Sequence, residues 1–586
     1  MSIRIFFPAP TSALMVLPIP ADRDGVLRVL TAERELLELP GVRSTVPVYN
    51  KLLVEGSPES WDENEMRARL MRAGENALAG VPPEPEVEPV ELPVCYDPEL
   101  GPDLEEVARR AGMTTTEVIE LHSASTYTVM ATGFAPGFAY LGEIDARLAA
   151  PRRSSPRIRV PQGTLGIADR RTGVYPVDGP GGWRLLGRVP PSLFADVHRR
   201  VRRFSPGGLV RFRPISRKAY EEMEKCEERA ETGAASGGET SDAAGRTAVS
   251  VVDQAPHLVV ERTGPLATVQ DPGRIGGRRL GFGPGGAMDQ SSCLWANRLL
   301  DNAPHDALIE VSIGGLALRF RTGMVIALAG ADLSTTLDGA PVAPWRTTKV
   351  EAGQRLHFGY APDGMRAYVA FPGGLSAARV YGSASTVLRE GLDGLLGHPL
   401  RPGDELRSLD PARKLPRRRL PAAAVPDHLR RSGTGDAVQP KGDGARAPAL
   451  TLPLVTGFEW HEFEASDRAR FLASDWKIDP ASGRTAIRLA GPTLASGPKV
   501  LDSTPVVDGT VQVTGDGQPL VFMRDRPTAG GYAKLGAVVA DALDALAQAR
   551  PGAVARFVLA DPAEARRAMV EREAFFGIGA GRDRLS

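Results

Sequence analysis

The segment best suited to chemistry lies in the first half of the chain, where a loop rich in glycine and aromatic residues follows a histidine. Two glycines and a proline fix this loop, and glycine lets the backbone approach a ligand closely. His122 lies near the end of a short helix that begins at the capping-box residues 114–117. The helix dipole favours a cation there, so His122 binds an anion, acts as a general acid or only satisfies backbone carbonyls. The loop residues expected to contact a ligand are Gly133, Phe134, Pro136, Gly137 and Phe138.

A cluster of arginines follows this loop. Arg152 and Arg153 come first, and Arg157 and Arg159 then alternate with apolar residues at the spacing of a β-strand. Guanidinium groups in such a row suit a phosphate or a carboxylate, because each presents a planar fork of donors. A charged barrel exterior explains the pattern equally well. We therefore carry Arg152 and Arg153 forward as candidate binding residues.

Carboxylates and amides in turn-like segments are the candidates in the second half of the chain. Asp271 and Arg274 belong to one segment, Asp289 to another, and Asn297 follows eight residues later. Such oxygens suit Mg²⁺ or an amide substrate, although Asp and Asn in turns usually only hydrogen-bond the backbone. Residues 528–532, Thr-Ala-Gly-Gly-Tyr, form either an anion-binding nest or a tight barrel turn.

Composition defines the class of protein that must position these residues. The chain has 586 residues, enough for about four domains, and its 64 glycines and 50 prolines favour turn-rich β structure. Its 71 basic and 71 acidic residues balance, which argues against an overall basic surface for nucleic acid. Three scattered cysteines fit a reducing cytoplasm, and no apolar run has the length of a membrane span.

We expect a mainly β fold with α+β parts, with β-barrel domains in both halves and a small α+β domain at the N-terminus. The same order of strand, Gly-Gly-aromatic turn, helix and Pro-Gly-led strand occurs at residues 163–212 and 509–557. Helices are predicted over 27–39, 61–79 and 535–546, and a strand over 43–55. The predicted parts are the small domain at 1–90, the first barrel at 91–226, a flexible linker at 227–255, the second half at 256–586 and a basic, flexible insertion within it at 410–448.

Missing motifs exclude several classes of enzyme. The chain has no Gly-x-x-x-x-Gly-Lys-Ser/Thr loop, which excludes a P-loop nucleotide site. It has no His-Glu-x-x-His motif, and its eight histidines are scattered, so we expect no histidine-rich metal site. The Gly-x-Ser-x-Gly turn of serine hydrolases is also missing.

Several long motifs resemble those of a known pair of bacterial proteins. The segments at Cys95, His122, 133–141 (Gly-Phe-Ala-Pro-Gly-Phe-Ala-Tyr-Leu), 160–164 and 180–183 resemble the B-type subunit of the bacterial 5-oxoprolinase, which is also called allophanate hydrolase subunit 1 or the sporulation-kinase inhibitor. Other segments resemble the C-type subunit, the inhibitor's antagonist. They are residues 270–274, 286–289, 296–297 and 382–383, Gln512, Asp525 and residues 528–532. The two resemblances together cover nearly the whole chain, in the order B then C.

The resemblance implies cyclophilin-like barrels and ATP-dependent opening of the 5-oxoproline lactam to glutamate, together with a separate A-type subunit. ATP would be a co-substrate with Mg²⁺ beside it, and the B–C unit would activate the lactam. Arginines would hold phosphate, Asp271 or Asp289 would hold Mg²⁺, and His122 would donate a proton or bind the carbonyl. The implied site contains His122, Asp289, Asn297 and Arg274 as catalytic groups, and Gly133, Phe134, Pro136, Gly137, Phe138, Arg152, Arg153, Asp271, Gln512, Thr528, Gly530, Gly531 and Tyr532 as binding groups.

Several positions depart from the family pattern. Ala384 stands where an Arg usually follows the Gly-Ser pair, and Gly208 stands where an Asp usually follows Pro-Gly. A Gly-Gly pair and an Arg are expected near Leu392 and His398, and Arg484 is followed by Thr-Ala instead of Met-Gly. Because most of these changes fall in the second half, we expect part of its site, or the choice of substrate, to be altered.

Two other functions stay open. The B–C arrangement also resembles the carboxyltransferase domain of urea carboxylase, which would need a biotin carrier and a carboxylase on separate proteins. In a non-catalytic role, the B half would bind a histidine kinase and the C half would restrain it, although a tether would keep the inhibitor permanently occupied. The expected partners are a lactam or amide substrate, the separate A-type oxoprolinase subunit, and a second copy of the chain, with no nucleic acid and no membrane.

Overall fold

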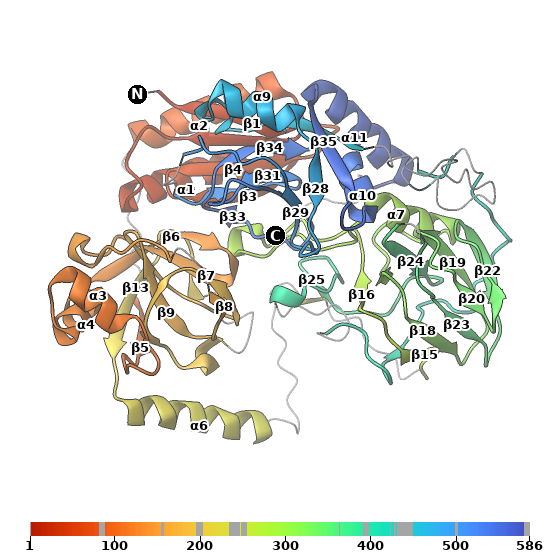
Figure 1. The fold of residues 1–586 in the computed structure, drawn as a ribbon, viewed down its shortest axis with the longest axis horizontal. Helices are drawn as coiled ribbons and strands as arrows, with labels where there is room; N and C mark the ends of the chain where they lie inside the picture. The colour runs from red at the N-terminus through yellow and green to blue at the C-terminus, as the bar shows by residue number, and fades with distance from the viewer. Residues whose placement is uncertain are drawn as a thin grey trace.

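The computed structural model shows three β-rich lobes (Figure 1). The small N-terminal unit and the C-terminal barrel lie side by side in the upper lobe, where strand β1 (Arg4–Ala9) contacts β34 (Lys534–Val538). The first barrel and a two-sheet unit form the two lower lobes. The structure describes residues 2–80, 88–153, 157–194, 203–233, 246–247, 255–362, 364–390, 398–421, 424–426, 429, 449–498 and 502–578.

The N-terminal unit is a four-stranded sheet buried on both faces. On one face of β2, Ala13 and Met15 pack against the two helices. On the other face, Leu14 and Val16 belong to a core shared with both barrels, as the alternation of side chains along a strand requires. The elements are β1 (Arg4–Ala9), β2 (Ser12–Val16), α1 (Arg23–Leu37), β3 (Val42–Val48), β4 (Lys51–Gly56) and α2 (Glu63–Ala79).

The helices predicted in this unit are confirmed. Asp22 and Asp62 cap α1 and α2, each by accepting a hydrogen bond from a backbone N–H of the first turn. The single strand predicted over residues 43–55 is instead two strands, because the chain turns at Tyr49, whose φ is 55°. The N-terminal unit is therefore α+β, as predicted.

The sheet of the N-terminal unit continues into the first barrel. Strand β3 pairs with β6 at Val48 and Ala131, which gives an 11-stranded sheet. Strand β13 branches from β6 and pairs with β5, and a bridge between Cys95, which follows β5, and Arg188 of β12 links this branch to the end of the sheet, so the second part of the sheet nearly closes. The elements are β5 (Val90–Val94), α3 (Leu104–Ala111), α4 (Thr115–Ala124), β6 (Thr126–Gly133), β7 (Ala135–Gly142), β8 (Arg157–Val160), β9 (Thr164–Ala168), β10 (Arg171–Val174), β11 (Gly179–Gly181), β12 (Arg184–Arg188), β13 (Leu209–Pro214) and α6 (Arg217–Gly233).

The third unit consists of two sheets around one core. The strand orders are β21-β20-β23-β18-β15-β26 and β16-β17-β24-β19-β22, and apolar residues from both sheets form a single cluster. Helix α7 (Gln290–Leu299) adds to this core. The strands are β15 (Leu258–Arg262), β16 (Leu266–Gln270), β17 (Leu308–Ser312), β18 (Ala317–Phe320), β19 (Met324–Gly330), β20 (Thr336–Leu337), β21 (Ala340–Pro341), β22 (Arg346–Val350), β23 (Arg355–His357), β24 (Arg366–Ala370), β25 (Arg379–Val380) and β26 (Glu405–Leu406).

The C-terminal unit is a closed barrel with strand order β27-β34-β31-β32-β29-β28-β35. The prediction of a mainly β chain with barrels in both halves is thereby confirmed. Among the residues that the structure describes, no helix is long and apolar enough to cross a membrane. The elements are β27 (Leu450–Thr456), α9 (Ala465–Ala473), β28 (Trp476–Ile478), β29 (Ala486–Ala490), β30 (Thr504–Pro505), β31 (Thr510–Val513), β32 (Pro519–Phe522), β33 (Ala529–Gly530), β34 (Lys534–Val538), α10 (Ala540–Gln548), β35 (Val554–Leu559) and α11 (Pro562–Phe576).

The element order that the sequence repeats also recurs in the structure. In the first barrel β13 runs parallel to β5, and in the C-terminal barrel β35 runs parallel to β27. The glycine that precedes the repeated strand makes the same backbone contact in both barrels. The Gly163 carbonyl accepts from the Val189 N–H at 2.8 Å, and the Gly509 carbonyl accepts from the Val538 N–H at 2.9 Å. The two barrels are therefore an internal repeat.

The helix predicted over residues 535–546 is wrong in its first part. Residues Lys534–Val538 form strand β34, which pairs with both β27 and β31, and α10 begins only at Ala540. A short apolar run suits either a helix or a buried strand, and the closure of the barrel decides between them here.

The second half divides into two units instead of the single β half that the sequence predicts over residues 256–586. The predicted linker begins as the end of α6, which continues to Gly233. The start of the predicted insertion lies against the two-sheet unit, where Arg418 forms an ion pair with Asp301 at 2.7 Å. Residues 430–448 and Leu392 lie outside the described residues.

Candidate functional site

Motifs from the two halves of the chain meet between the first barrel and the C-terminal barrel. A Cβ atom added to Gly133 would lie 2.6 Å from Thr528 Oγ1, and one added to Gly531 would lie 3.0 Å from an Nη atom of Arg152. The missing side chains therefore allow the close approach. We call this contact the hairpin–turn junction and define it as residues 133–138, Arg152 and residues 528–532. The structure thus brings together three groups of residues that the sequence proposed separately.

The two-sheet unit also reaches the hairpin between β6 and β7. The Phe134 carbonyl accepts a hydrogen bond from the Arg389 guanidinium, and Thr132 Oγ1 donates to the Arg279 carbonyl at 2.5 Å. The hairpin turns through positive φ angles of 145° at Gly133 and 66° at Phe134. A phenylalanine in this region is strained, so the surrounding contacts must hold it there. The hairpin is thus fixed by contacts with both units of the second half.

Aromatic rings support the hairpin from behind. Phe138 lies 4.8 Å from Tyr140 and 5.5 Å from Trp183, centroid to centroid, in edge-to-face contacts. Ala529 of the turn belongs to the same apolar core. Phe138 is buried, so its role is to shape the hairpin, whereas Phe134 is half-buried at its tip.

The two candidate arginines separate in the structure. Arg152 reaches the turn, is about one-third exposed, and has Asp169 at 3.7 Å. Arg153 instead lies 3.7 Å from Asp103, a buried carboxylate that also binds Arg157 at 2.7 Å. The structure therefore brings Arg152 to the hairpin–turn junction and directs Arg153 away from it.

The turn at residues 528–532 is held from inside the barrel. Lys534 Nζ donates to the carbonyls of Gly530 and Tyr532 at 3.0 and 2.9 Å. Burial lowers the pKa of this lysine, and Glu459 opposes that effect. Thr504 pairs with Gly530 across β30 and β33. These contacts describe a tight barrel turn, the alternative to an anion-binding nest that the sequence left open.

Three buried oxygens beside this turn lack a hydrogen-bond partner among the residues that the structure describes. They are Thr504 Oγ1, Gln512 Oε1 and Thr528 Oγ1. A Cβ atom added to Gly530 would lie 2.7 Å from Gln512 Oε1, so the amide and the turn are close together. An unsatisfied buried polar atom costs about 1–3 kcal/mol, which a ligand with matching donors and acceptors would remove. The cluster therefore suits a small polar ligand such as an amide.

His122 does not lie at the junction. It is fully buried in the first barrel, where its Nδ1 lies 3.0 Å from the Tyr96 hydroxyl and its Nε2 lies 3.0 Å from Thr172 Oγ1. Its ring stacks on Phe212, and burial lowers its pKa to about 3. The prediction of a cationic proton donor is therefore wrong, because the loss of solvent outweighs the helix dipole. We remove His122 from the candidate site.

Asp271 and Arg274 belong to a second, buried cluster in which two turn motifs pack together. The Arg274 N–H donates to the Pro284 carbonyl at 2.8 Å, and the Ala287 N–H donates to the Asp271 carbonyl at 2.8 Å. The Asp271 carboxylate accepts from the hydroxyls of two serines, Ser383 and Ser385, and from the backbone N–H groups of Gly273 and Ala384. Asp271 therefore holds the turns in place.

Asp289 and Asn297 also have structural partners. Asp289 caps α7 by accepting from the backbone N–H and hydroxyl of Ser292, and Gln548 donates to it at 2.8 Å. Asn297 donates to the Asp306 carbonyl and accepts from Asn302. These contacts speak against the predicted catalytic roles of both residues.

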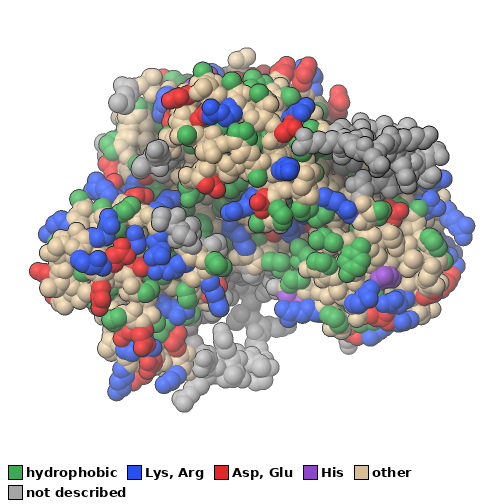
Figure 2. All heavy atoms as spheres, in the orientation of Figure 1, with side chains coloured by type: hydrophobic (Ala, Val, Ile, Leu, Met, Phe, Trp, Pro, Cys, Tyr) green, Lys and Arg blue, Asp and Glu red, His purple; other side chains and the backbone are tan. Residues whose placement is uncertain are grey.

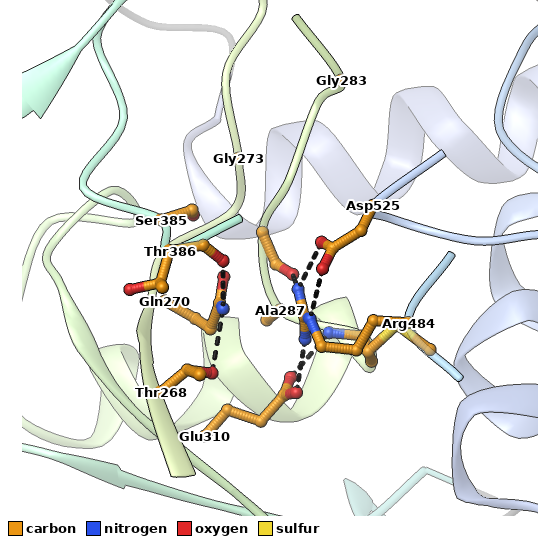
Figure 3. A network of polar contacts seen from close by, with 12 residues as sticks. Thr268, Gln270, Gly273, Gly283, Ala287, Glu310, Ser385, Thr386, Arg484 and Asp525 are labelled. Atoms are coloured by element: carbon orange, nitrogen blue, oxygen red, sulfur yellow. Dashed lines mark hydrogen bonds and ion pairs between the residues drawn. The ribbon is translucent and has the colours of Figure 1, made fainter. Parts of the chain in front are cut away.

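The ion-pair network in Figure 3 joins the two-sheet unit to the C-terminal barrel. Arg484 lies between two carboxylates, with Nη1 at 2.6 Å from Glu310 and Nη2 at 2.9 Å from Asp525. Burial alone would lower the pKa of Arg484, but the two carboxylates raise it above its usual range. Arg484 also donates to the Gly286 carbonyl at 2.7 Å, so the network fixes the turn beside Arg274.

The described residues contain no group of three or more His, Cys, Asp or Glu side chains that could hold a metal ion. The oxygens of Asp271 and Asp289 already accept hydrogen bonds from serine hydroxyls and backbone or amide N–H groups. These contacts do not fit the prediction that one of them holds Mg²⁺, which prefers free oxygen ligands in octahedral geometry.

Sequence reasoning missed the arginines that link the units. Arg278 pairs with Glu55 and Arg279 with Glu33, so a segment of the two-sheet unit is fixed against the N-terminal unit. Arg524 and Arg526, which were also missed, pair with Asp508 within the C-terminal barrel, and the Arg-Asp-Arg run at 524–526 was the available signal for them. Figure 2 shows several Lys and Arg side chains around the hollow where the lobes meet.

Comparisons with known proteins first define a class. A family model for subdomains C and D of the carboxyltransferase domain matches residues 5–202, and one for subdomains A and B matches residues 280–559. Together the two matches cover most of the chain. The chain therefore belongs to the carboxyltransferase-domain proteins.

Curated relatives narrow this class. The B-type 5-oxoprolinase subunit of Bacillus subtilis (strain 168) is 39% identical over 210 residues, which are 34% of this chain and 85% of that protein. The C-type 5-oxoprolinase subunit of Escherichia coli (strain K12) is 34% identical over 321 residues, which are 54% of this chain and 96% of that protein. The chain thus joins members of the B-type and C-type families of 5-oxoprolinase subunits in one polypeptide, and the resemblance seen in its motifs is confirmed.

Two further proteins are similar to this chain. A crystal structure of the protein TTHA0988 is similar over 95% of this chain and 100% of its own, with a TM-score of 0.72 and 30% sequence identity. The urea amidolyase of Lachancea kluyveri is 29% identical over 323 residues, which are 51% of this chain and 17% of that protein. The urea-processing relative is thus more distant than the oxoprolinase subunits.

Proposed function

We propose that the chain is the B–C component of an ATP-dependent 5-oxoprolinase, which activates the lactam of 5-oxoproline and, with a separate A-type subunit, converts it to glutamate. The observation that carries the proposal is the hairpin–turn junction. It joins the B-type loop and the C-type turn into one place, as two subunits of one enzyme would require. Because the reaction consumes ATP, we place it in the cytoplasm.

The proposed reaction has two steps. The lactam oxygen first attacks the γ-phosphorus of ATP, ADP leaves, and the ring carbon becomes a strong electrophile. In the second step water attacks that carbon, the carbon–nitrogen bond breaks and the nitrogen takes up a proton, and a second water then releases phosphate from the resulting acyl phosphate of glutamate. The protein must position the two substrates and stabilise charge on the transferred phosphoryl group.

Residues at the junction suit these tasks. Arg152 is about one-third exposed, and its carboxylate partner among the described residues, Asp169, lies at 3.7 Å, so the guanidinium can also bind a phosphate. The unsatisfied oxygens of Gln512 and Thr528 suit the N–H and carbonyl of a lactam. Mg²⁺ would arrive with the nucleotide, whose phosphate oxygens supply ligands that the described carboxylates do not.

The test is glutamate formation from 5-oxoproline and ATP in the presence of the A-type 5-oxoprolinase subunit. We expect turnover to need both proteins and to fall at least about tenfold in Thr528→Val, which removes one hydroxyl at nearly constant volume. Thr451→Val is the matched control, because Thr451 is an exposed threonine on β27 of the same barrel. Equal activity of the two variants would remove Thr528 from the site, and no turnover with the wild-type chain would refute the function.

A second candidate is transfer of a carboxyl group from biotin to urea or an amide. The names of the two family models and the similarity to urea amidolyase favour it. It predicts that the chain decarboxylates carboxybiotin in the presence of urea, without ATP. A chain with that activity and no glutamate formation would support this candidate over the oxoprolinase, and a chain with neither activity would leave kinase binding as the function to measure.

A further inference from the structure

A hollow of about 700 Å³ lies where the two-sheet unit meets helix α11. It is lined by the end of α7 and the loop that follows it, by residues 417–419 and by Phe576 of α11. None of these residues belongs to the hairpin–turn junction. In Figure 1, α7 and β22 lie in the lower right lobe, whereas β6 and β7 lie in the lower left lobe. The hollow is therefore a separate feature.

The arginine run at 417–419 is held at the edge of a sheet. Strand β22 is at one end of its sheet, and a bridge joins Arg346 of β22 to Arg419. The Arg418 N–H donates to Thr347 Oγ1 at 2.7 Å, and the Thr347 N–H donates to the Arg418 carbonyl at 2.9 Å. The backbone thus fixes three arginines in a row, so a ligand would meet a preformed set of cations.

Two arginines of the hollow have structural roles. Arg418 forms a two-point ion pair with Asp301, in which both nitrogen–oxygen distances are 2.7 Å, and it also donates to the Leu299 carbonyl at the end of α7. Arg298 donates to the Phe575 carbonyl, and its guanidinium lies 4.3 Å from the centroid of the Phe575 ring. These contacts hold the wall together and account for both side chains.

Arg417 and Arg419 have no such role. The side chains along 417–419 are exposed, half-buried and exposed, so Arg417 and Arg419 lie on the same side of an extended segment. Neither side chain forms a hydrogen bond or an ion pair with any part of the chain that the structure describes. The wall contains four arginines and one carboxylate, Asp301, a net charge of +3. Two free guanidinium groups in such a field attract an anion with more than one negative charge.

An aromatic wall stands beside the arginines. Trp295 is half-buried and lies 5.4 Å from Phe576, centroid to centroid, with the two ring planes nearly perpendicular. Leu294 and Leu299 of α7 are buried and complete the apolar part of the wall. Planar bases stack on aromatic side chains of this kind in many nucleotide-binding sites. The hollow thus offers an apolar surface next to a cationic one.

The size of the hollow suits a molecule with both kinds of group. Sites for small molecules and cofactors measure about 300–1,000 Å³, and the hollow lies within that range. A single phosphate would reach the arginines and leave the aromatic wall uncovered. A ligand that carries phosphates and a planar ring would use both parts.

We propose that this hollow binds a nucleoside diphosphate or triphosphate, with its phosphates on Arg417 and Arg419 and its base against Trp295. Guanidinium groups recognise phosphates through paired N–H donors. The other source of the same phosphate chemistry is inorganic pyrophosphate. The bound nucleotide is not the ATP that would react at the hairpin–turn junction, so this site does not rest on the proposed function.

The experiment is isothermal titration calorimetry of the full chain without Mg²⁺, with neither 5-oxoproline nor the A-type 5-oxoprolinase subunit present. The probes are ADP, pyrophosphate, adenosine and succinate, a dianion without phosphate. We expect ADP to bind and pyrophosphate to bind more weakly than ADP. Adenosine and succinate should bind at least about tenfold more weakly than ADP, because each lacks the diphosphate that the arginines hold.

Variants of side chains that are exposed or half-buried locate the binding. Arg417→Gln combined with Arg419→Gln should weaken the binding of ADP and pyrophosphate at least about tenfold. Trp295→Leu should weaken ADP binding at least about fivefold and leave pyrophosphate binding unchanged, which also shows that this variant is folded. Arg109→Gln combined with Arg110→Gln is the matched control, because these are two exposed arginines on α3, and it should change neither.

Three outcomes would overturn the proposal. They are that neither ADP nor pyrophosphate binds the wild-type chain, that the Arg417 and Arg419 double variant binds both as tightly as the wild type, or that adenosine or succinate binds as tightly as ADP.

Other outcomes would identify the source of the phosphates. Pyrophosphate that binds as tightly as ADP, or ADP binding that Trp295→Leu leaves unchanged, would keep the arginine site and show that the diphosphate alone is recognised. Glutamate formation enters none of these measurements, so a failure of the oxoprolinase function and a failure of this site are distinguishable.

Discussion

Arg484 illustrates how one residue joins two units. Its guanidinium pairs with Glu310 of the two-sheet unit and Asp525 of the C-terminal barrel, and all three side chains are buried. We expect Arg484→Met to lower the free energy of unfolding by about 3–5 kcal/mol, because it leaves two buried carboxylates without a cation. Urea unfolding measures the loss.

The control for this change is Arg488→Met. Arg488 is an exposed arginine on β29, and its replacement should alter the unfolding free energy by less than about 0.5 kcal/mol. Equal effects of the two substitutions would show that the network does not contribute to stability.

His122 should make the stability of the first barrel depend on pH. In the unfolded chain the imidazole takes up a proton below its ordinary pKa of 6.5, but in the folded barrel it does so only near 3. Between these values the unfolded state binds more protons, so stability falls as the pH decreases, by up to about 1.4 kcal/mol per pH unit. His122→Gln removes this dependence.

Thermal unfolding of the wild type and of His122→Gln at pH 7 and pH 5 measures the effect. The advantage of the wild type should shrink at pH 5. A difference between the two proteins that stays constant with pH would mean that His122 is not held neutral in the folded barrel.

The types of the site residues could be predicted, but their roles could not. Asp271 and Asp289 are carboxylates, a residue type that can bind a metal ion. In the structure their oxygens instead accept hydrogen bonds from serine hydroxyls and backbone N–H groups. The partners come from residues far apart in the sequence, such as Gln548 for Asp289. A local pattern cannot indicate whether a carboxylate is already satisfied by a distant partner.

At the scale of elements, the contact between the β6–β7 hairpin and the turn at 528–532 has little tolerance for added atoms. Gly133→Ala places a methyl group 2.6 Å from Thr528 Oγ1 and a side chain at a φ of 145°. We expect a clear loss of stability, roughly 1–3 kcal/mol, from the strain and the crowding together. The thermal midpoint of the full chain is the readout.

A second substitution separates these two causes. Thr528→Ala removes the crowding oxygen, so the double variant should recover part of the loss, while the strain at residue 133 remains. Strictly additive effects of the two substitutions would contradict the contact between hairpin and turn.

Elements with strong local signals could be predicted, and elements defined by pairing could not. The capping box at Thr114 and Glu117 forms as expected at the start of α4. In contrast, residues 534–538 have the apolar pattern of a helix and form strand β34, because two strands from distant parts of the chain pair with it. Barrel closure is a long-range property that a short window does not contain.

At the scale of the whole molecule, the two halves form one body through contacts that do not depend on the linker. Arg43 of the N-terminal unit binds Glu573 of α11 through both oxygens at 2.8 Å, and Arg171 of the first barrel lies 3.2 Å from Asp502. The internal repeat between the barrels was visible in the sequence, because glycines and prolines mark its turns. The way the N-terminal unit lies against the last barrel was not visible, because no local pattern specifies it.

The central claim is that catalysis needs groups from both halves at one junction. The most direct measurement is glutamate formation from 5-oxoproline and ATP, with the A-type protein present, by the intact chain, by residues 1–233 alone, by residues 246–586 alone, and by the two pieces mixed. We predict activity for the intact chain and for the mixture, whose pieces should also co-elute, and none for either piece alone. Glutamate formed by a single piece, or none formed by the intact chain, would contradict the account.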